Sequence, residues 1–218
     1  MLKAVLFDMD GVIVDTEPLH RKAYYGMFDT LKIDVSDAQY QSFTGQSTIN
    51  VCRKLCDHFK LTNNPEYLVQ VKRNIFKDLF KNDPELQLID GVLDLIKEYH
   101  DNGLTLVLAS SASMGTIESV FNRFELDQYF LTKLSGADLK ASKPHPEIFI
   151  NAAKVSGHSK NNCLVIEDST NGIQAAHAAD IFCVGYKSAN SKNQDYSKAN
   201  FVINDFKEIE YEKVRLLL

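Results

Sequence analysis

Short apolar runs rich in β-branched residues recur along this chain, and stretches with helical spacing separate them. Continuous apolar runs of this length, alternating with helices, are typical of a parallel sheet that is buried on both faces. Parallel strands need right-handed connections, which the intervening helices would supply. The chain is therefore expected to fold as an α/β protein. The predicted strands cover residues 4–7, 105–109, 131–134, 163–166, 182–185 and 201–203.

A long interval without a convincing strand interrupts this alternation. Helix-start signals at Ser36 and Asn64, together with amphipathic spacing, predict helices there instead. We expect an all-helical insertion over 16–84, within a core made of 1–15 and 85–218. Because the insertion follows the carboxyl end of the first strand, where open α/β sheets bind ligands, it is a candidate lid. Its predicted helices cover 17–31, 47–60 and 65–81.

The 218 residues carry 24 Lys and Arg against 29 Asp and Glu, for a net charge of −5. This balance lacks the basic excess of nucleic-acid-binding proteins, so we expect no nucleic-acid or anionic-membrane partner. No apolar run in the sequence approaches the roughly 18 residues of a membrane span, and the first residues do not form a signal peptide. We therefore expect a cytoplasmic protein that acts on a small molecule, with a monomer as the favoured state.

Polar residues that suit catalysis stand at the ends of three predicted strands. Because the carboxyl ends of parallel strands meet at one edge of a sheet, these side chains would share a crevice. They comprise four carboxylates, two hydroxyls and one ammonium. The set is Asp8 and Asp10 after the first strand, Ser110 and Ser111 after the second, Glu167 and Asp168 after the fourth, and Lys143 in the loop before residue 146.

The chemistry of this set points to phosphoryl transfer. Four carboxylates cannot share a small volume in ionised form without repulsion or raised pKa values, and a divalent cation relieves both. Oxygen ligands without nearby His or Cys favour Mg²⁺ over zinc. A cation beside hydroxyl, backbone N–H and Lys donors would clamp a phosphoryl group. Asp8 could then attack phosphorus, while Asp10 protonates the leaving oxygen and later activates water.

Each motif has a weaker interpretation when it is taken alone. An Asp-x-Asp-Gly segment is common in turns, and an EF-hand loop beginning at Asp8 fails because its twelfth residue is Leu19 instead of Glu. A phospho-acceptor receiver domain also places acids, Mg²⁺ and Lys around a phosphorylated Asp. Receivers are shorter, lack a helical insertion and place the acceptor after a middle strand, so this interpretation is disfavoured.

Taken together, the motifs resemble those of the haloacid-dehalogenase superfamily of phosphotransferases. They are DMDGV at 8–12, the serine at 110, Lys143 in SKP, and EDSTNG at 167–172. The helical insertion resembles the small cap of the subgroup that holds β-phosphoglucomutase and sugar-phosphate phosphatases. The resemblance covers nearly the whole chain, and it implies a Rossmann-like three-layer core, a mobile helical cap and a phosphoaspartyl intermediate.

The resemblance also implies a role for each motif residue. Asp8 would be the nucleophile and Asp10 the general acid/base. Lys143 and Ser110, with Ser111 beside it, would bind phosphate. The Mg²⁺ ligands would be Asp8, the carbonyl of Asp10 and Asp168, with Glu167 in or next to that shell.

The insertion would decide whether water or a sugar hydroxyl takes the phosphoryl group. The mutases carry a Lys and an Arg around a cap-loop glycine where this chain has Thr44 and Thr48, and neutral Thr holds a second phosphate poorly. Arg53, about one turn further on, could substitute. We therefore expect an Mg²⁺-dependent phosphatase of a small phosphomonoester, such as a sugar phosphate, ahead of a β-phosphoglucomutase-type mutase. An inorganic pyrophosphatase ranks third.

Other residues of the insertion are candidates for substrate contacts. Thr16 lies at the expected hinge, and His20 takes the place of a mutase histidine that couples cap closure to acid/base chemistry. His20 could equally be a polar interface residue, so both interpretations stay open. The loop of Thr44, Gly45 and Gln46 would line the substrate side, with close backbone approach at Gly45 and hydroxyl contacts from Gln46.

Overall fold

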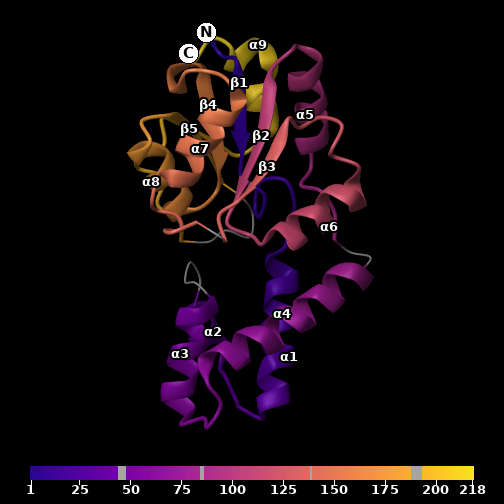
Figure 1. Cartoon of the computed structure of the whole chain (residues 1–218), viewed down its shortest axis with the longest axis vertical. Helices are drawn as coiled ribbons and strands as arrows, with labels where there is room; N and C mark the ends of the chain where they lie inside the picture. The colour runs from indigo at the N-terminus through magenta and orange to yellow at the C-terminus, as the bar shows by residue number, and fades with distance from the viewer. Residues whose placement is uncertain (44–47, 84–85, 138, 188–192) are drawn as a thin grey trace. The chain divides into compact units, whose positions relative to one another are not determined.

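The computed structural model describes residues 1–43, 48–83, 86–137, 139–187 and 193–218 of the chain. These residues divide into two compact units (Figure 1). Unit 1 consists of Met1–Asp15 and Gln87–Leu218, and unit 2 consists of Thr16–Leu86. Within the described ranges, no helix is both long enough and apolar enough to cross a membrane.

The described strands of unit 1 are β1 (Ala4–Phe7), β2 (Thr105–Ser110), β3 (Thr132–Ser135), β4 (Cys163–Glu167), β5 (Phe182–Tyr186) and β6 (Phe201–Ile203). They form a parallel sheet in the order β3-β2-β1-β4-β5-β6. Leu6 of β1 pairs with Val107 of β2 on one side and with Val165 of β4 on the other. The strand order reverses between β1 and β4, and open α/β sheets bind ligands at such a reversal.

Helices cover both faces of this sheet (Figure 1). They are α5 (Val92–Asp101), α6 (Met114–Phe124), α7 (Glu147–Ser156), α8 (Thr170–Ala178) and α9 (Tyr211–Val214), with 3-10 turns at Lys160–Asn162 and Phe206–Ile209. Because successive strand residues point to opposite faces, Leu6 packs in one core cluster with Phe149 of α7, whereas Phe7 faces the other way. The Phe7 ring lies 6.3 Å from that of Tyr99 in α5. The predicted Rossmann-like three-layer α/β class is therefore confirmed.

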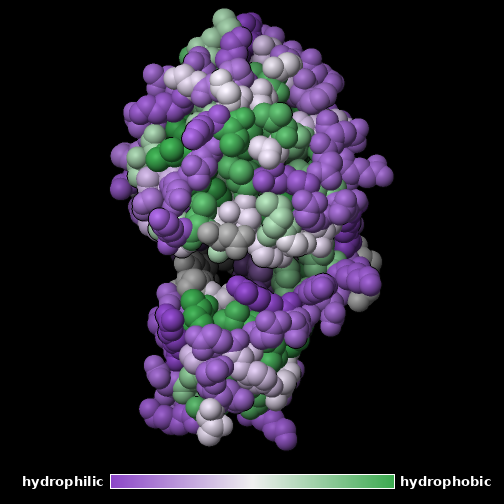
Figure 2. Space-filling view, in the orientation of Figure 1, coloured by the Kyte–Doolittle hydropathy of each residue, from purple (hydrophilic) through white to green (hydrophobic). Residues whose placement is uncertain are grey.

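Polar residues shift several element boundaries from those that the apolar pattern predicts. The strands β2 and β4 each extend by one residue, because the backbones of Ser110 and Glu167 still pair with the neighbouring strands. Helix α7 begins at Glu147, with Pro146 as its N-cap residue. Hydrophilic residues cover most of the visible surface of each unit, with apolar residues showing in a patch on unit 1 (Figure 2).

The described residues of unit 2 form the helices α1 (Glu17–Leu31), α2 (Asp37–Gln41), α3 (Thr48–Phe59) and α4 (Pro65–Asn82). The expected helix starts are capped, since Ser36 Oγ accepts from the Gln39 N–H at 3.2 Å and Asn64 Oδ1 from the Tyr67 N–H at 2.8 Å. Leu68 of α4 belongs to a buried apolar cluster with side chains from α1 and α3. Burial of a Leu side chain stabilises a fold by roughly 1.5–3 kcal/mol, so this cluster gives unit 2 a core of its own.

Candidate active site

Asp8 directly follows β1, at the reversal of the strand order. Its N–H donates to the Ile166 carbonyl of β4 at 3.0 Å, which fixes the backbone where the side chain leaves the sheet. The chain then turns sharply, because the N–H groups of Ile13 and Val14 both donate to the Met9 carbonyl. This turn keeps Asp10 close to Asp8, and Asp8 is only 6% exposed.

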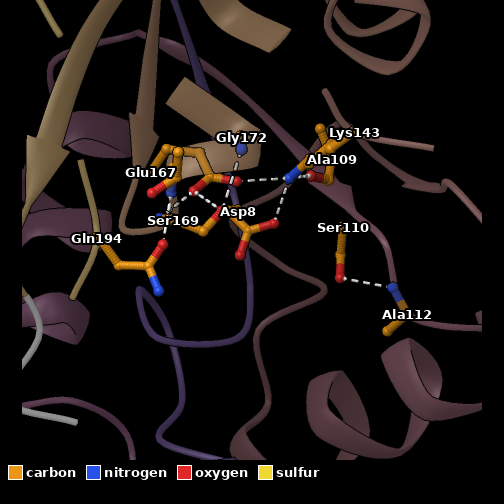
Figure 3. Close-up of polar contacts among 10 residues, drawn as sticks. Asp8, Ala109, Ser110, Ala112, Lys143, Glu167, Ser169, Gly172 and Gln194 are labelled. Atoms are coloured by element: carbon orange, nitrogen blue, oxygen red, sulfur yellow. Dashed lines mark hydrogen bonds and ion pairs between the residues drawn. The ribbon is translucent and has the colours of Figure 1, made fainter. Parts of the chain in front are cut away.

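The ammonium of Lys143 joins the ends of three strands (Figure 3). Its Nζ donates to Asp8 Oδ1 at 2.5 Å, to Glu167 Oε1 at 2.9 Å and to the Ala109 carbonyl at 3.0 Å. The Lys143 side chain is buried, and a buried ammonium requires this degree of pairing and hydrogen bonding. The predicted phosphate-binding lysine therefore also orients the predicted nucleophile.

Glu167, the last residue of β4, is held through both carboxylate oxygens. Besides the Lys143 contact on Oε1, Oε2 accepts from the Ser169 N–H at 2.7 Å and from Ser169 Oγ at 2.9 Å. Ser169 Oγ in turn accepts from the Gly172 N–H at 3.1 Å and so caps α8. A Cβ at Gly172 would lie 1.7 Å from Glu167 Oε1, so only glycine fits there. These contacts place Glu167 beside the expected metal ligands, where its carboxylate holds Lys143 and Ser169 in position.

Asp168 lies against the turn that follows Asp8. A Cβ at Gly11 would come within 2.1 Å of Asp168 Oδ2, and Gly11 also has a left-handed φ of +84°. Two independent constraints thus require glycine at this position. Asp168 is 4% exposed, so the acids that follow β1 and β4 share one largely buried space.

The electrostatics of this space are those of a buried acid with further acids nearby. Burial raises the pKa of Asp8 to about 7; Lys143 opposes this change, whereas Glu167 and Asp10 add to it. Burial lowers the pKa of Lys143, but the attraction of Asp8 and Glu167 outweighs burial and leaves that pKa raised. Lys143 is therefore held protonated, and the raised pKa of Asp8 shows that additional positive charge would stabilise the ionised site.

Magnesium fits this donor chemistry, although within the described ranges no three His, Cys, Asp or Glu groups form a ready-made metal cluster. Asp8, Asp168 and the Asp10 carbonyl offer hard oxygen donors at adjoining strand ends, which Mg²⁺ prefers. The raised pKa of Asp8 comes from its burial and from the neighbouring acids Glu167 and Asp10, and a bound cation would offset both effects. Asp8, Asp168 and the Asp10 carbonyl are thus the groups that would hold it.

The predicted serine loop follows β2 at the same edge of the sheet. Ser110 is buried, and its Oγ accepts from the Ala112 N–H at 3.1 Å (Figure 3). Ser135, at the end of β3, donates from Oγ to the Ala112 carbonyl at 2.7 Å and holds the loop in place. Ser111 is exposed. Of the two predicted hydroxyls, Ser110 is thus held within its own loop, whereas Ser111 is exposed.

In unit 2, His20 of α1 is paired with Lys72 of α4. The His20 Nδ1 lies 2.7 Å from Lys72 Nζ, and its ring stacks on Phe76 with centroids 4.3 Å apart. The Lys72 ammonium also lies 5.1 Å from the centre of the Tyr24 ring. Burial, and then the charge of Lys72, lowers the pKa of His20 well below its ordinary value. His20 is therefore neutral, and its Nδ1 accepts a hydrogen bond from Lys72.

The other predicted residues of the insertion differ in burial and in hydrogen bonding, and some of them lie outside the described residues. Thr16 is buried and is the N-cap residue of α1. Arg53 is exposed and donates to Asn50 Oδ1 at 3.2 Å, so it points along the surface of its own helix. The predicted loop residues Thr44, Gly45 and Gln46 lie outside the described residues.

Three residues near these groups were not identified from the sequence. Ser169 could have been found because a Ser directly before a predicted helix is an N-cap signal. Lys72 and Gln194 carry no local signal, because their partners His20 and Thr170 lie 52 and 24 residues away along the chain. Contacts at that sequence separation depend on the fold.

A buried acid braced by an ammonium at the strand-order reversal defines an enzyme site suited to phosphoryl transfer. The family model described as haloacid dehalogenase-like hydrolase matches residues 5–186. The chain belongs to this family, and it is a phosphohydrolase.

Curated relatives include Hexitol phosphatase B of Escherichia coli (strain K12), which is 28% identical over 204 residues, covering 94% of this chain and 90% of that protein. Another is Protein SUPPRESSOR OF QUENCHING 1, chloroplastic, of Arabidopsis thaliana, which is 30% identical over 194 residues. This second match covers 88% of the present chain but only 18% of the Arabidopsis protein. The chain thus spans nearly all of one relative and a small part of the other.

A solved structure with the same fold is that of β-phosphoglucomutase from Clostridium difficile. It superposes with a TM-score of 0.79 at 26% sequence identity. The match covers 99% of this chain and 96% of that one, so it includes the residues of both units.

Proposed function

We propose that this phosphohydrolase hydrolyses a small sugar phosphate through a phosphoaspartyl intermediate on Asp8. The observation that carries the proposal is the buried Asp8 carboxylate, held by Lys143 at 2.5 Å where the strand order reverses. A carboxylate fixed in this way is oriented for attack before substrate arrives. The substrate class is supported by the name of the E. coli relative, a hexitol phosphatase.

The chemistry would proceed in two displacements. In the first, an Asp8 oxygen bonds to phosphorus and the ester P–O bond breaks, while Asp10 gives its proton to the departing alcohol oxygen. In the second, Asp10 takes a proton from water as that water attacks phosphorus, and Asp8 is released with inorganic phosphate. Lys143, Ser110 and backbone N–H groups would stabilise the charge on the phosphoryl oxygens.

Magnesium dependence is part of the same proposal. Asp8, Asp168 and the carbonyl of Asp10 would hold Mg²⁺, with Glu167 beside them. When bound, Mg²⁺ would offset the negative charge of the phosphoryl oxygens and lower the repulsion among these acids. Lys143 would retain its contact with Glu167.

We infer that residues 16–84 act as a cap on a core formed by 1–15 and 85–218. Closure of such a cap excludes bulk water and admits small substrates, so a phosphoprotein would be a poor substrate. Thr16 would serve as a hinge, and the neutral His20 would act from the cap on the acid/base step of Asp10. Thr44, Gly45 and Gln46 would contact the sugar, and the enzyme would act in the cytoplasm.

A phosphomutase is the second candidate, because a β-phosphoglucomutase matches the fold over both units. A mutase must hold a second phosphate while the sugar turns over. Arg53, which could have supplied that cation, is exposed and bonded to Asn50 of its own helix, and Thr48 is neutral. These observations favour water as the phosphoryl acceptor.

One assay separates the two candidates. The purified protein is incubated with β-glucose 1-phosphate, a trace of glucose 1,6-bisphosphate and Mg²⁺, and glucose 6-phosphate and free phosphate are measured in the same tube. Hexitol phosphates and pyrophosphate are tested in parallel. Release of phosphate without glucose 6-phosphate supports the phosphatase. Accumulation of glucose 6-phosphate would make the protein a mutase, and release only from pyrophosphate would identify a pyrophosphatase.

Chelation tests the metal. We expect EDTA to abolish phosphate release, and Mg²⁺ to restore it where Ca²⁺ does not, because Ca²⁺ prefers more ligands at longer distances. Full activity in EDTA-treated enzyme would contradict the proposed role of Asp8, Asp10 and Asp168 as a metal site.

A further inference from the structure

Gln194 reaches back from the segment after β5 to the first residue of α8 (Figure 3). Its Oε1 accepts from the Thr170 N–H at 2.8 Å, and the N–H of the next residue, Asp195, donates to Thr170 Oγ1 at 2.8 Å. The first N–H groups of a helix have no partner within the helix. Two successive residues of a distant segment therefore form hydrogen bonds with the first residue of α8, in addition to the local cap from Ser169.

The segment that presents Gln194 is itself fastened to β5. The Tyr196 ring packs on Gly185, where a Cβ would come within 2.9 Å of Tyr196 Cδ1. Its hydroxyl donates to the Tyr186 carbonyl at 3.3 Å. Further along, Asn200 forms two hydrogen bonds with the backbone of Cys183, at 2.8 and 2.9 Å. Gln194 thus belongs to a segment that is held against β5. This reduces the conformational entropy that is lost when Gln194 forms its hydrogen bond with Thr170.

The hydrogen bonds to Thr170 lie two residues along the chain from Asp168, the proposed metal ligand. Asp168 stands in the turn between β4 and α8, with Glu167 before it and Ser169 after it. Glu167 is held by Lys143 and by Ser169, and Thr170 is held by Gln194. Asp168 is therefore fixed from both ends of a four-residue turn, and the contacts of Gln194 and Asp195 with Thr170 come from outside the recognised motifs.

We propose that Gln194 is a positioning residue, which holds the turn of residues 167–170 through Thr170 and thereby sets the direction of the Asp168 carboxylate. The inference rests on the proposed function, since it takes Asp168 as a Mg²⁺ ligand. Gln194 acts through its hydrogen bond with the Thr170 N–H. Residues that orient metal ligands in this way usually change metal affinity when they are removed.

The test compares Gln194→Ala, Gln194→Glu and the control Ser197→Ala with the wild type. Ser197 is an exposed neighbour whose backbone N–H, not its side chain, donates to Asp195 Oδ1. Titration calorimetry with MgCl₂ alone measures metal affinity. We expect Gln194→Ala to weaken it about 3- to 10-fold, less than the roughly 10- to 100-fold typical of a direct partner of a metal ligand. The Ser197→Ala affinity should stay within about twofold.

Two further readouts separate positioning from general damage. In Gln194→Ala the Thr170 amide should exchange its hydrogen at least about tenfold faster, and Gln194→Glu should restore protection because its carboxylate accepts the same bond at a helix N-terminus. At saturating Mg²⁺, kcat should stay within about twofold of the wild type. Unchanged Thr170 exchange or unchanged Mg²⁺ affinity in Gln194→Ala would overturn the proposal.

The outcome for the wild type keeps this inference distinct from the proposed function. A wild-type protein that binds no Mg²⁺ would contradict the metal in the proposed function. In that case the Thr170 exchange rate, with its rescue by Gln194→Glu, still decides whether Gln194 holds the turn. Faster exchange supports the positioning role, and equal exchange rejects it.

Discussion

The Lys143 Nζ and the Asp8 Oδ1 lie 2.5 Å apart although 135 residues separate them along the chain. The same ammonium donates to Glu167, so a single side chain aligns the acids at the ends of β1 and β4. Because the ammonium is buried and fully bonded, it holds Asp8 in one direction before any substrate binds. Asp8 is therefore the residue at which the proposed mechanism is most directly tested.

Asp8→Asn should abolish phosphate release and leave the fold intact. The amide has the shape of the carboxylate and its oxygen still accepts from Lys143, but it is not a nucleophile. We expect turnover to fall by roughly 10⁴-fold or more, as for other enzymes that lose a nucleophile. Phosphate release and thermal melting by circular dichroism provide the measurements, with the exposed Asp57→Asn as control. Phosphate release that survives in Asp8→Asn would exclude a phosphoaspartyl intermediate.

Gly172→Ala should disrupt the site through Glu167. The new Cβ would lie 1.7 Å from Glu167 Oε1, and the carboxylate can move away only by giving up Lys143 or Ser169. Disturbing a buried ion pair in this way should lower the free energy of unfolding by about 3 kcal/mol and remove most activity. Urea melts and phosphate release are the two measurements.

Gly115→Ala is the matched control for that substitution. Gly115 lies in α6, and a Cβ there meets no atom within 4 Å. This variant should be neutral or more stable by up to about 1 kcal/mol, because alanine favours helix. Equal effects of the two substitutions would show that the close approach of Glu167 to Gly172 is unimportant.

The pairing of His20 with Lys72 predicts a pH effect on the stability of unit 2. The folded pKa of His20 lies below its ordinary value of 6.5, so the unfolded chain takes up this proton first as pH falls. The contribution of His20 to the free energy of unfolding should therefore be fully present above pH 6.5. It should decrease as pH falls through the folded pKa, by at most about 1.4 kcal/mol per pH unit from this group.

Urea melts between pH 7.5 and pH 5 measure this effect. His20→Gln should remove that part of the slope, since glutamine does not titrate. The control His58→Gln changes an exposed ring of α3 and should leave the slope as it is in the wild type. A slope that is identical in wild type and His20→Gln would mean that His20 does not contribute.

The apolar pattern was sufficient to predict the strands because a sheet covered on both faces needs continuous apolar runs. It missed the last residue of β2, β3, β4 and β5, and it included Leu131, which precedes β3. Among the missed residues, Ser110 and Glu167 are polar, and their backbones pair although their side chains belong to the site. The three longer helices of unit 2 were predicted well for a similar reason, since α1, α3 and α4 each bury an apolar stripe.

The argument that the carboxyl ends of parallel strands meet at one edge located the site residues but not the contacts that orient them. It placed Asp8, Glu167 and Asp168 at one edge of the sheet, where the structure has them. The three-way bonding of Lys143 and the reach of Gln194 to Thr170 depend on side-chain geometry across many residues, which no local pattern encodes. The same holds for the pairing of His20 with Lys72, which joins two helices of unit 2.

The ion pair of Lys22 with Asp83 should stabilise unit 2 more than an exposed pair does. Lys22 Nζ lies 2.7 Å from Asp83 Oδ2 and joins α1 to the residue that ends α4, near the places where the chain enters and leaves the unit. The Asp83 side chain is only 6% exposed, so its charge is weakly screened. A double-mutant cycle with Lys22→Met and Asp83→Asn, measured by urea melts, should give a coupling energy of about 1–2 kcal/mol.

The matched control is a cycle on Arg21 and Asp37, whose side chains are 56% and 70% exposed and lie at a similar distance of 3.0 Å. This exposed pair should give a coupling energy of less than about 1 kcal/mol. Equal coupling in the two cycles would show that the burial of Asp83 does not strengthen its pairing with Lys22.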